Sequence, residues 1–271
     1  GNIDIFGHGV PISQCGFCDF DTSRLPRQRN PSRRRPLYGH ERNPGSAICG
    51  DAMTQGDESL CEEFRDFIRQ TDFPCVGAKS TLSRDQLTLV TAADIRCAGG
   101  DRKILNAVHG FLRDHEAEPK MFTSFAALFQ GPRDLDEATF EAHLWARLNA
   151  LHRLDAETFA WSSEVSADPE SPNFGFSLGG HAFFIVGLHP GSSRTARRLP
   201  HPAIVFNLHE QFQDLRARGQ YGRIKETIID RDVKLDGTPN PMIAEHGTVS
   251  EARQYSGRAV DDDWRCPFVR A

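Results

Sequence analysis

The apolar and polar positions along the chain predict short buried strands separated by amphipathic helices. Short apolar runs rich in Phe, Ile and Val are bounded by proline and glycine, which is typical of buried strands. One run alternates between apolar and polar residues, which indicates a strand with one buried face. The expected strands cover residues 73–80, 86–92, 121–129, 174–178, 181–188 and 203–208.

Between these runs, apolar residues recur at intervals of three and four, which predicts helices. Ser59, Asp101 and Asp136 are expected to begin three of them, because their side-chain oxygens can accept hydrogen bonds from the first free backbone N–H groups. The last helix is expected to loosen at Gly219 and Gly222. The expected helices cover residues 59–70, 101–115, 136–151 and 209–229, with one more turn at 155–161.

The order of these elements favours an α+β fold. Strands and helices do not alternate strictly, so we expect a mostly antiparallel sheet flanked by helices. After Asp232 the chain becomes a long irregular C-terminal segment, and a loop of this length is usually functional or disordered. The segment holds Tyr255, Trp264 and Phe268 together with arginines, so we expect it to pack against the domain.

Residues 1–57 differ in composition from the rest of the chain. Their central part is rich in Arg and Pro and nearly free of apolar residues, so it cannot bury enough surface to offset its ordering entropy. We therefore expect a disordered extension over 1–57 and one domain over 58–271. Cys15 and Cys18 form a single CxxC pair in the extension, which is a weak sign of a zinc or redox site.

The bulk composition narrows the function. The 271 residues are 38% hydrophobic and 25% charged, as in ordinary soluble domains, and the net charge of −5 argues against a nucleic-acid partner. No apolar run approaches the roughly 20 residues that span a bilayer, so no membrane partner is expected. The seven cysteines show no framework spacing, which indicates reduced thiols and a cytoplasmic protein. The composition leaves the oligomeric state open.

Four of the eleven histidines lie in residues 179–216. His209 stands where a buried strand changes into a helix, a position well placed to meet a molecule bound in a cleft. His181 and His189 would share one face of a strand, but they are too far apart to bind one metal ion. A basic turn between the two strands can bind carboxylates through its arginines, which are Arg194, Arg197 and Arg198.

Several motifs together resemble the YqcI/YcgG family. They are GGHAFFIVGLHPGSSRTARRLPHPAIVFNLHEQF, IIDRDVKLDGTPNP, EARQYSGR and the terminal WRCPF, with FPCVGAKS near the front. The resemblance covers about residues 60–268. Characterised members that the sequence resembles are haem proteins that hydroxylate a guanidino nitrogen. The resemblance therefore implies haem b with its iron as cofactor and arginine or a related guanidino compound as substrate. An external electron donor or peroxide is also implied, because the sequence has no flavin or nicotinamide fingerprint.

Two residues are candidates for the axial ligand of such a haem. His209 follows an apolar strand and shares a helix face with Phe212. Cys266 is its rival, because a cysteinate donates electron density that favours O–O cleavage. Both could lie in one pocket on opposite sides of the iron, and the sequence leaves the choice open.

Further residues could complete the site. Arg194, Arg198 and Arg258 could bind the haem propionates, and His181 follows two glycines that allow a close approach to a ligand. Glu164 and Asp168 precede a buried strand and could hold the guanidinium, which makes them the catalytic candidates. The alternative to an enzyme is a non-catalytic haem-binding or sensing protein. A non-haem metal hydrolase is disfavoured because no i, i+4 histidine pair is present.

Overall fold

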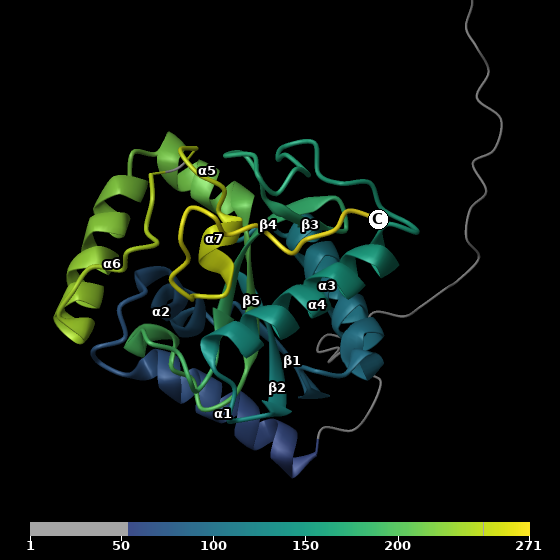
Figure 1. Ribbon diagram of the computed structural model, residues 1–271, viewed down its shortest axis with the longest axis horizontal. Coiled ribbons are helices and arrows are strands. Elements are labelled where there is room, and N and C mark those ends of the chain that lie inside the picture. The colour runs from purple at the N-terminus through teal and green to yellow at the C-terminus, as the bar shows by residue number, and fades with distance from the viewer. Residues whose placement is uncertain (1–53, 246) are drawn as a thin grey trace, which may run out of the picture. The chain divides into compact units, whose positions relative to one another are not determined.

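The computed structural model describes residues 54–245 and 247–271 (Figure 1). Most of the expected extension, including the Cys15–Cys18 pair, lies outside these residues. The first helix, α1 (Gln55–Arg69), begins before the predicted cap. Thr54 caps it instead, because its Oγ accepts from the N–H of Asp57 at 3.2 Å and its own N–H donates back to the Asp57 carboxylate at 3.1 Å.

A five-stranded sheet lies at the centre of the domain. Its strands are β1 (Leu87–Asp94), β2 (Ser124–Gly131), β3 (Phe176–Leu178), β4 (His181–Leu188) and β5 (Ala203–Leu208). They lie in the order β1-β2-β5-β4-β3, and only the β1–β2 pair is parallel. The prediction of an α+β fold with a mostly antiparallel sheet is confirmed.

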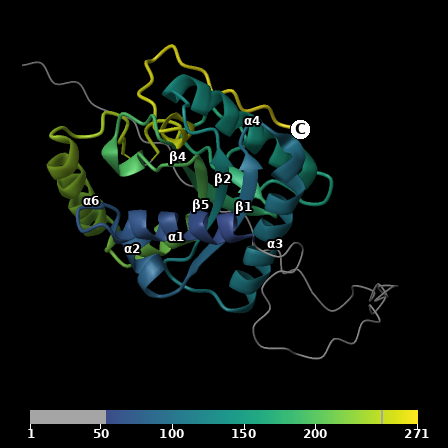
Figure 2. The ribbon, with the colours of Figure 1, turned by 90° about the horizontal axis from the view of Figure 1, so that it is seen from below.

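Helices cover both faces of the sheet. The helices α3 (Asp101–Ala117), α4 (Glu137–Asp155) and α7 (Ala252–Tyr255) pack on one face, together with the C-terminal segment. Helix α1 packs on the other face and crosses the strands in Figure 2. At the side of the sheet away from α3 and α4 lie α5 (His209–Ala217) and α6 (Tyr221–Asp236), as Figure 1 shows. No helix of the described residues is long and apolar enough to cross a membrane.

The two-residue period of the strands sorts their side chains between the two faces. On β5, Ile204, Phe206 and Leu208 belong to the core under α3 and α4, whereas Ala203 packs in the core under α1. Continuing this alternation places Asn207 on the α1 side of the sheet. His209 stands two residues after Asn207, at the start of α5, so the end of β5 carries polar side chains to this side.

Three segments differ from their predicted secondary structure. Residues 73–80 do not form a strand, because helix α2 (Val76–Ser83) begins there and Cys75 caps it, its Sγ accepting from the N–H of Ala78 at 3.4 Å. The predicted helix over 209–229 is two helices, since Gly219 has a left-handed φ of 66° and ends α5. The extra turn expected at 155–161 is not helical.

Candidate functional site

A cavity of about 410 Å³ lies on the α1 side of the sheet. Its floor is formed by strand residues and its walls by α1, α2, α5 and α6, with the segment before α7 closing it. Apolar side chains dominate the lining. They include Phe64, Phe67, Phe73, Phe184, Val186, Leu188, Val205, Phe212, Leu215, Ile224, Ile228, Ile229 and Ile243.

Helix α6 turns one face toward this cavity. Tyr221, Ile224, Lys225, Ile228 and Asp232 line it at helical spacing. Of the α6 residues only Asp232 is buried, so the isoleucines of this face are half-exposed to the cavity. An amphipathic helix normally packs its apolar stripe against a core. Here the stripe faces a void, so apolar surface of α6 remains available to a ligand.

His209 lines the cavity and is held by a carboxylate. Its Nε2 lies 2.9 Å from Oε1 of Glu251, and the same oxygen accepts a hydrogen bond of 2.5 Å from the hydroxyl of Tyr255. An ionised carboxylate only accepts, so Nε2 of His209 donates this hydrogen bond. Burial and the nearby Glu251 raise the pKa of Tyr255 well above its ordinary value, so the phenol remains a donor.

The backbone also constrains the His209 ring. A Cβ added to Gly175 would lie 3.0 Å from Cε1 of His209 and 2.8 Å from a methyl carbon of Val165. The absence of a side chain at Gly175 thus lets the chain before β3 approach the imidazole closely. The ring is therefore held between this backbone and Glu251.

Polar groups interrupt the apolar floor near His209. Ser124 and Asn207 are partners across β2 and β5, and Oγ of Ser124 donates to Oδ1 of Asn207 at 2.8 Å. Gln211 accepts from the N–H of Thr123 at 2.9 Å and donates to its carbonyl at 2.7 Å. This polar strip gives a ligand hydrogen-bonding groups at one end of the apolar cavity.

Arg197 brings a cation to the cavity wall. It donates from Nη1 to the carbonyls of Gly187 and Tyr255, each at 3.2 Å, and no ion pair joins it to a carboxylate of the described residues. Burial lowers its pKa to about 10, against the opposing influence of Asp232 and Glu137, so the guanidinium is charged at neutral pH.

Two further cations line the cavity from α5 and α6. Nζ of Lys225 donates to the carbonyl of Ala244 at 3.3 Å, and the guanidinium of Arg216 lies 4.5 Å from the ring centre of Tyr221. Together with Arg197, these side chains give an apolar cavity three positive groups.

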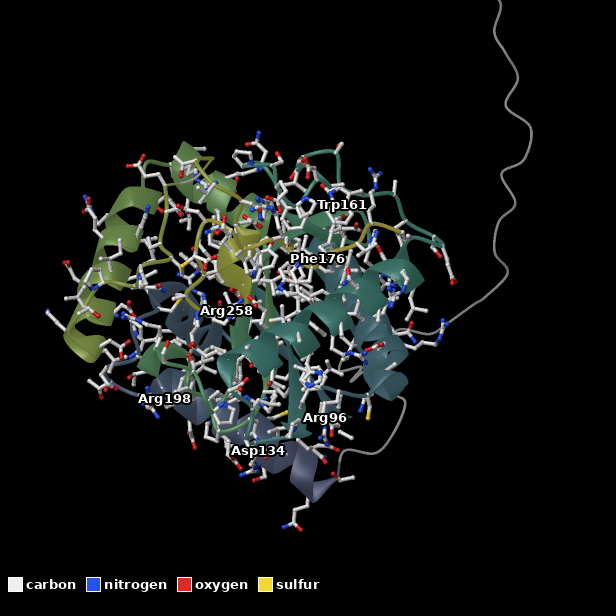
Figure 3. The ribbon with its side chains drawn as sticks, viewed as in Figure 1. Arg96, Asp134, Trp161, Phe176, Arg198 and Arg258 are labelled. Atoms are coloured by element: carbon white, nitrogen blue, oxygen red, sulfur yellow. The ribbon has the colours of Figure 1, made fainter. Side chains whose placement is uncertain are left out.

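The structure does not bring the predicted arginines to the cavity. Arg194 is buried in ion pairs with Asp232 and Asp236. Arg198 donates to the backbone carbonyls of Ser192 and Ser193, and Arg258 pairs with Glu141 at 2.5 Å. Figure 3 shows Arg198 and Arg258 well apart. Each of the three has a structural partner, and none of them lines the cavity. Of the arginines in the basic turn, Arg197 lines the cavity.

Cys266 does not share a pocket with His209. It packs against the core that contains Trp145 and Tyr255, and it is not among the residues that line the cavity. Burial raises the pKa of its thiol to about 12, which disfavours the thiolate that a metal would bind. The expectation that His209 and Cys266 face one iron from opposite sides is therefore corrected, because only His209 reaches the cavity.

The remaining predicted residues also lie away from the cavity. His181 is partly exposed and its Nε2 lies 2.9 Å from a carboxylate oxygen of Glu116. Glu164 and Asp168 are exposed in the turn before β3, where a carboxylate of Asp168 accepts from the N–H of Glu170. Within the described chain, no three His, Cys, Asp or Glu residues lie close enough to hold a metal ion together.

The sequence offers Glu251 as one possible carboxylate for a guanidinium, but the pairing of Glu251 with Tyr255 and His209 was not predicted. Glu251 immediately precedes α7 and Tyr255 ends it, four positions later, so both side chains lie on the same side of this turn. They belong to the EARQYSGR motif, which drew attention through its arginines and not through this pair. The alternation along β5 could also have predicted that Asn207 lies beside His209.

Comparison with known proteins gives one result. Neither the curated proteins nor the solved structures yield a match. A family model described as the YqcI/YcgG family matches residues 64–269, which include the whole sheet and every residue of the His209–Glu251–Tyr255 cluster. The chain therefore belongs to the YqcI/YcgG family.

Proposed function

We propose that the cavity binds haem b through His209 and that the protein N-hydroxylates the guanidino group of arginine or a related small molecule. One observation carries this proposal. A mostly apolar cavity of about 410 Å³ contains His209, and a carboxylate holds one nitrogen of that ring. The sequence also resembles guanidino N-hydroxylases of the YqcI/YcgG family, and this resemblance supports the choice of cofactor and substrate.

The lining fits the chemistry that a haem requires. Its apolar walls suit a porphyrin, and a haem iron can be held by a single protein imidazole. The cations of Arg197, Lys225 and Arg216 suit the two propionates. The cavity volume also falls within the range of about 300–1,000 Å³ that is usual for ligand pockets.

Different residues of the cavity would bind the haem, orient its ligand and position the substrate. Bound haem supplies the activation of oxygen or peroxide that allows one oxygen atom to be inserted into a nitrogen. His209 would hold the group, and Glu251 would orient the ring, as carboxylates do for metal-binding histidines. Oε1 of Glu251 accepts from His209 and Tyr255, whereas Oε2 has no partner among the described residues. Oε2 can therefore accept from a guanidinium and position it.

The proposal includes an external electron donor or peroxide, since the sequence carries no flavin or nicotinamide fingerprint. A cytoplasmic location belongs to the same proposal. The guanidino substrate and the peroxide or electron donor would reach the cavity from solvent. The proposal assigns no residue of a second protein chain to the site.

An absorption spectrum tests the cofactor. The purified full chain, mixed with haemin, should show a Soret band that His209→Ala weakens or abolishes. Cys266→Ala and the partly exposed His181→Ala serve as controls and should keep the spectrum. The haem proposal is wrong if the protein takes up no haem, and the ligand assignment is wrong if His209→Ala leaves the spectrum unchanged.

Turnover then separates the enzyme from the alternative. The haem-loaded protein should convert arginine or another small guanidine into its N-hydroxy product when given peroxide or a reducing system with oxygen, as mass spectrometry would detect. A protein that binds haem but hydroxylates none of these compounds would instead support the haem-sensing alternative.

A further inference from the structure

Oxidisable aromatic side chains form a row from Tyr255, which hydrogen-bonds the cavity-lining Glu251, to the surface beyond the other face of the sheet. The ring of Tyr255 stacks on Trp145 with centroids 5.6 Å apart, and Trp145 lies 6.5 Å from Trp264. Trp145 and Tyr255 are fully buried, whereas Trp264 is half-buried and reaches solvent. We propose that Tyr255, Trp145 and Trp264 conduct single electrons between the cavity and the surface. This inference rests on the proposed redox function of the cavity.

The inner end of the row is built for coupled loss of an electron and a proton. The hydroxyl of Tyr255 donates to Oε1 of Glu251 at 2.5 Å, and Glu251 contacts His209 at the cavity. A phenol loses an electron most readily when its proton can move to a nearby base. Tyr255 has such a base, although burial keeps it protonated in the resting protein.

Each transfer moves one electron along the aromatic row, and one proton moves between Tyr255 and Glu251. Bound haem would supply, with peroxide and in the absence of substrate, a one-electron oxidant, and Tyr255 would give up one electron to it. The phenolic proton moves to Oε1 of Glu251, which leaves a neutral tyrosyl radical. An electron from Trp145 then restores Tyr255, and the proton returns from Glu251. This step is uphill, because oxidised Trp145 is the stronger oxidant, and it is drawn forward as the next two steps remove the oxidising equivalent; with no oxidant in the cavity, the same route runs downhill from Tyr255 toward an oxidised tryptophan. Trp264 then restores Trp145, and a small reductant in solvent, such as ascorbate, restores Trp264.

Trp145 suits the middle position because it cannot readily lose a proton. Its Nε1 is buried and has no hydrogen-bond partner among the described residues. An oxidised indole in this place keeps its proton, so it remains a strong oxidant and takes an electron from Trp264. Arg253, whose guanidinium lies 5.8 Å from the ring centre of Trp264, marks the outer end near solvent.

Pulse radiolysis of the haem-free full chain tests the route without any cofactor. Azide radicals oxidise accessible tryptophan, and a tyrosine then donates an electron to the tryptophanyl radical. We expect tyrosyl absorbance to grow as tryptophanyl absorbance decays, at a rate independent of protein concentration. Tyr255→Phe should abolish this intramolecular growth, and Trp145→Phe should slow it or abolish it.

Trp161 provides the matched control. It is also half-buried, but its aromatic neighbours are His152, Phe174, Phe176 and Phe268, and neither Trp145 nor Tyr255 is among them. Trp161→Phe should leave the electron transfer unchanged, whereas Trp264→Phe should reduce the electron transfer. Because Trp264 is half-buried, the second substitution opens no void in the core. Unchanged transfer in both Tyr255→Phe and Trp264→Phe would overturn the proposal.

The haem-loaded protein provides the second arm. Peroxide added without a guanidino substrate should produce a tyrosyl signal in electron paramagnetic resonance, which ascorbate removes and Tyr255→Phe lacks. If the haem-free chain transfers the electron but the loaded protein forms no radical, the proposed redox function of the cavity fails and the aromatic route stands. If neither arm shows Tyr255-dependent transfer, the route itself is refuted.

Discussion

The imidazole of His209 is constrained from two directions, by a carboxylate and by a glycine. Glu251 determines which ring nitrogen carries the proton, because an ionised carboxylate accepts from Nε2. Gly175 determines how near the backbone comes to Cε1. These two contacts are independent, so they can be tested by separate substitutions.

Glu251→Gln should weaken haem binding. The amide can donate to Nε2 as well as accept from it, so the ring is no longer held in one tautomer. Loss of such a carboxylate partner typically costs about 10–100-fold in metal affinity. Titration with haemin, followed at the Soret band, measures the change. The exposed Glu164→Gln is the matched control and should bind haem as wild type does, and equal affinities in all three proteins would contradict the assigned role.

Gly175→Ala should destabilise the protein by about 1–3 kcal/mol, because the new methyl group must displace His209 or Val165. Urea unfolding of the haem-free chain gives the value. Gly222→Ala offers the same substitution where no atom lies within 4 Å, in the first turn of α6. It should not destabilise the protein, since alanine is the better helix former. A Gly175→Ala variant as stable as wild type would show that the ring can move freely.

Among the elements, α6 is joined to the basic turn by a buried ion cluster. Arg194 pairs with Asp232 and Asp236 from the last turns of α6, and the N–H of Thr195 donates to the Asp236 carboxylate at 3.1 Å. All three charged side chains are about one-tenth exposed. The cluster therefore holds α6 in place even though the isoleucines of α6 face the cavity.

Asp232→Ala should destabilise the domain by about 3–5 kcal/mol, since it leaves the buried Arg194 with only part of its compensation. Chemical denaturation of the haem-free chain measures the loss. Arg194→Met combined with Asp232→Leu and Asp236→Leu removes all three charges and should cost less than Asp232→Ala alone. If the single substitution costs no more than an exposed ion pair such as Arg218–Asp214, the cluster does not anchor α6.

For the whole molecule, buried titratable groups limit the stable pH range on both sides. Burial lowers the pKa of His152 and His189 from the ordinary 6.5, so they stay neutral in the folded protein while the unfolded chain takes up protons. Stability should therefore fall as the pH drops below about 6.5. Burial raises the pKa of Cys266 from 9.0 to about 12, so stability should also fall as the pH rises above 9.0.

Urea midpoints measured across this pH range test the prediction. His189→Phe should flatten the acid side of the profile, because it removes one group that the unfolded state protonates. Cys266→Ala should flatten the alkaline side in the same way. Profiles that neither substitution alters would show that other groups set the pH dependence.

The helices and strands could be predicted from the sequence better than the contacts between residues that are distant along the chain. Strand alternation and helix spacing are local, so β4, β5, α4 and the start of α5 at His209 agree with prediction. Residues 73–80 were assigned to a strand because they begin with an apolar run, and the cap at Cys75 is not visible in that pattern. The site depends on contacts across the fold, and Glu251 meets His209 only because α7 packs on β4.

For the same reason the choice among arginines could not be made from the sequence. Arg194, Arg197 and Arg198 share one turn and one chemistry. Their partners decide their roles, and these come from α6, from β4 and α7, and from the turn itself. Charge within a segment can be read locally, whereas the neutralisation of each charge requires the folded arrangement.

The apolar face that α6 turns to the cavity also has a consequence for the life of the protein in a cell. A ligand that binds only the folded state shifts the folding equilibrium toward that state. If haem fills the cavity as proposed, a newly made chain that lacks it leaves the isoleucines of α6 open to the cavity and is the form that proteases and chaperones recognise most readily. If the ligand is haem, we expect the abundance of this protein to rise and fall with the haem supply, even when its rate of synthesis is constant.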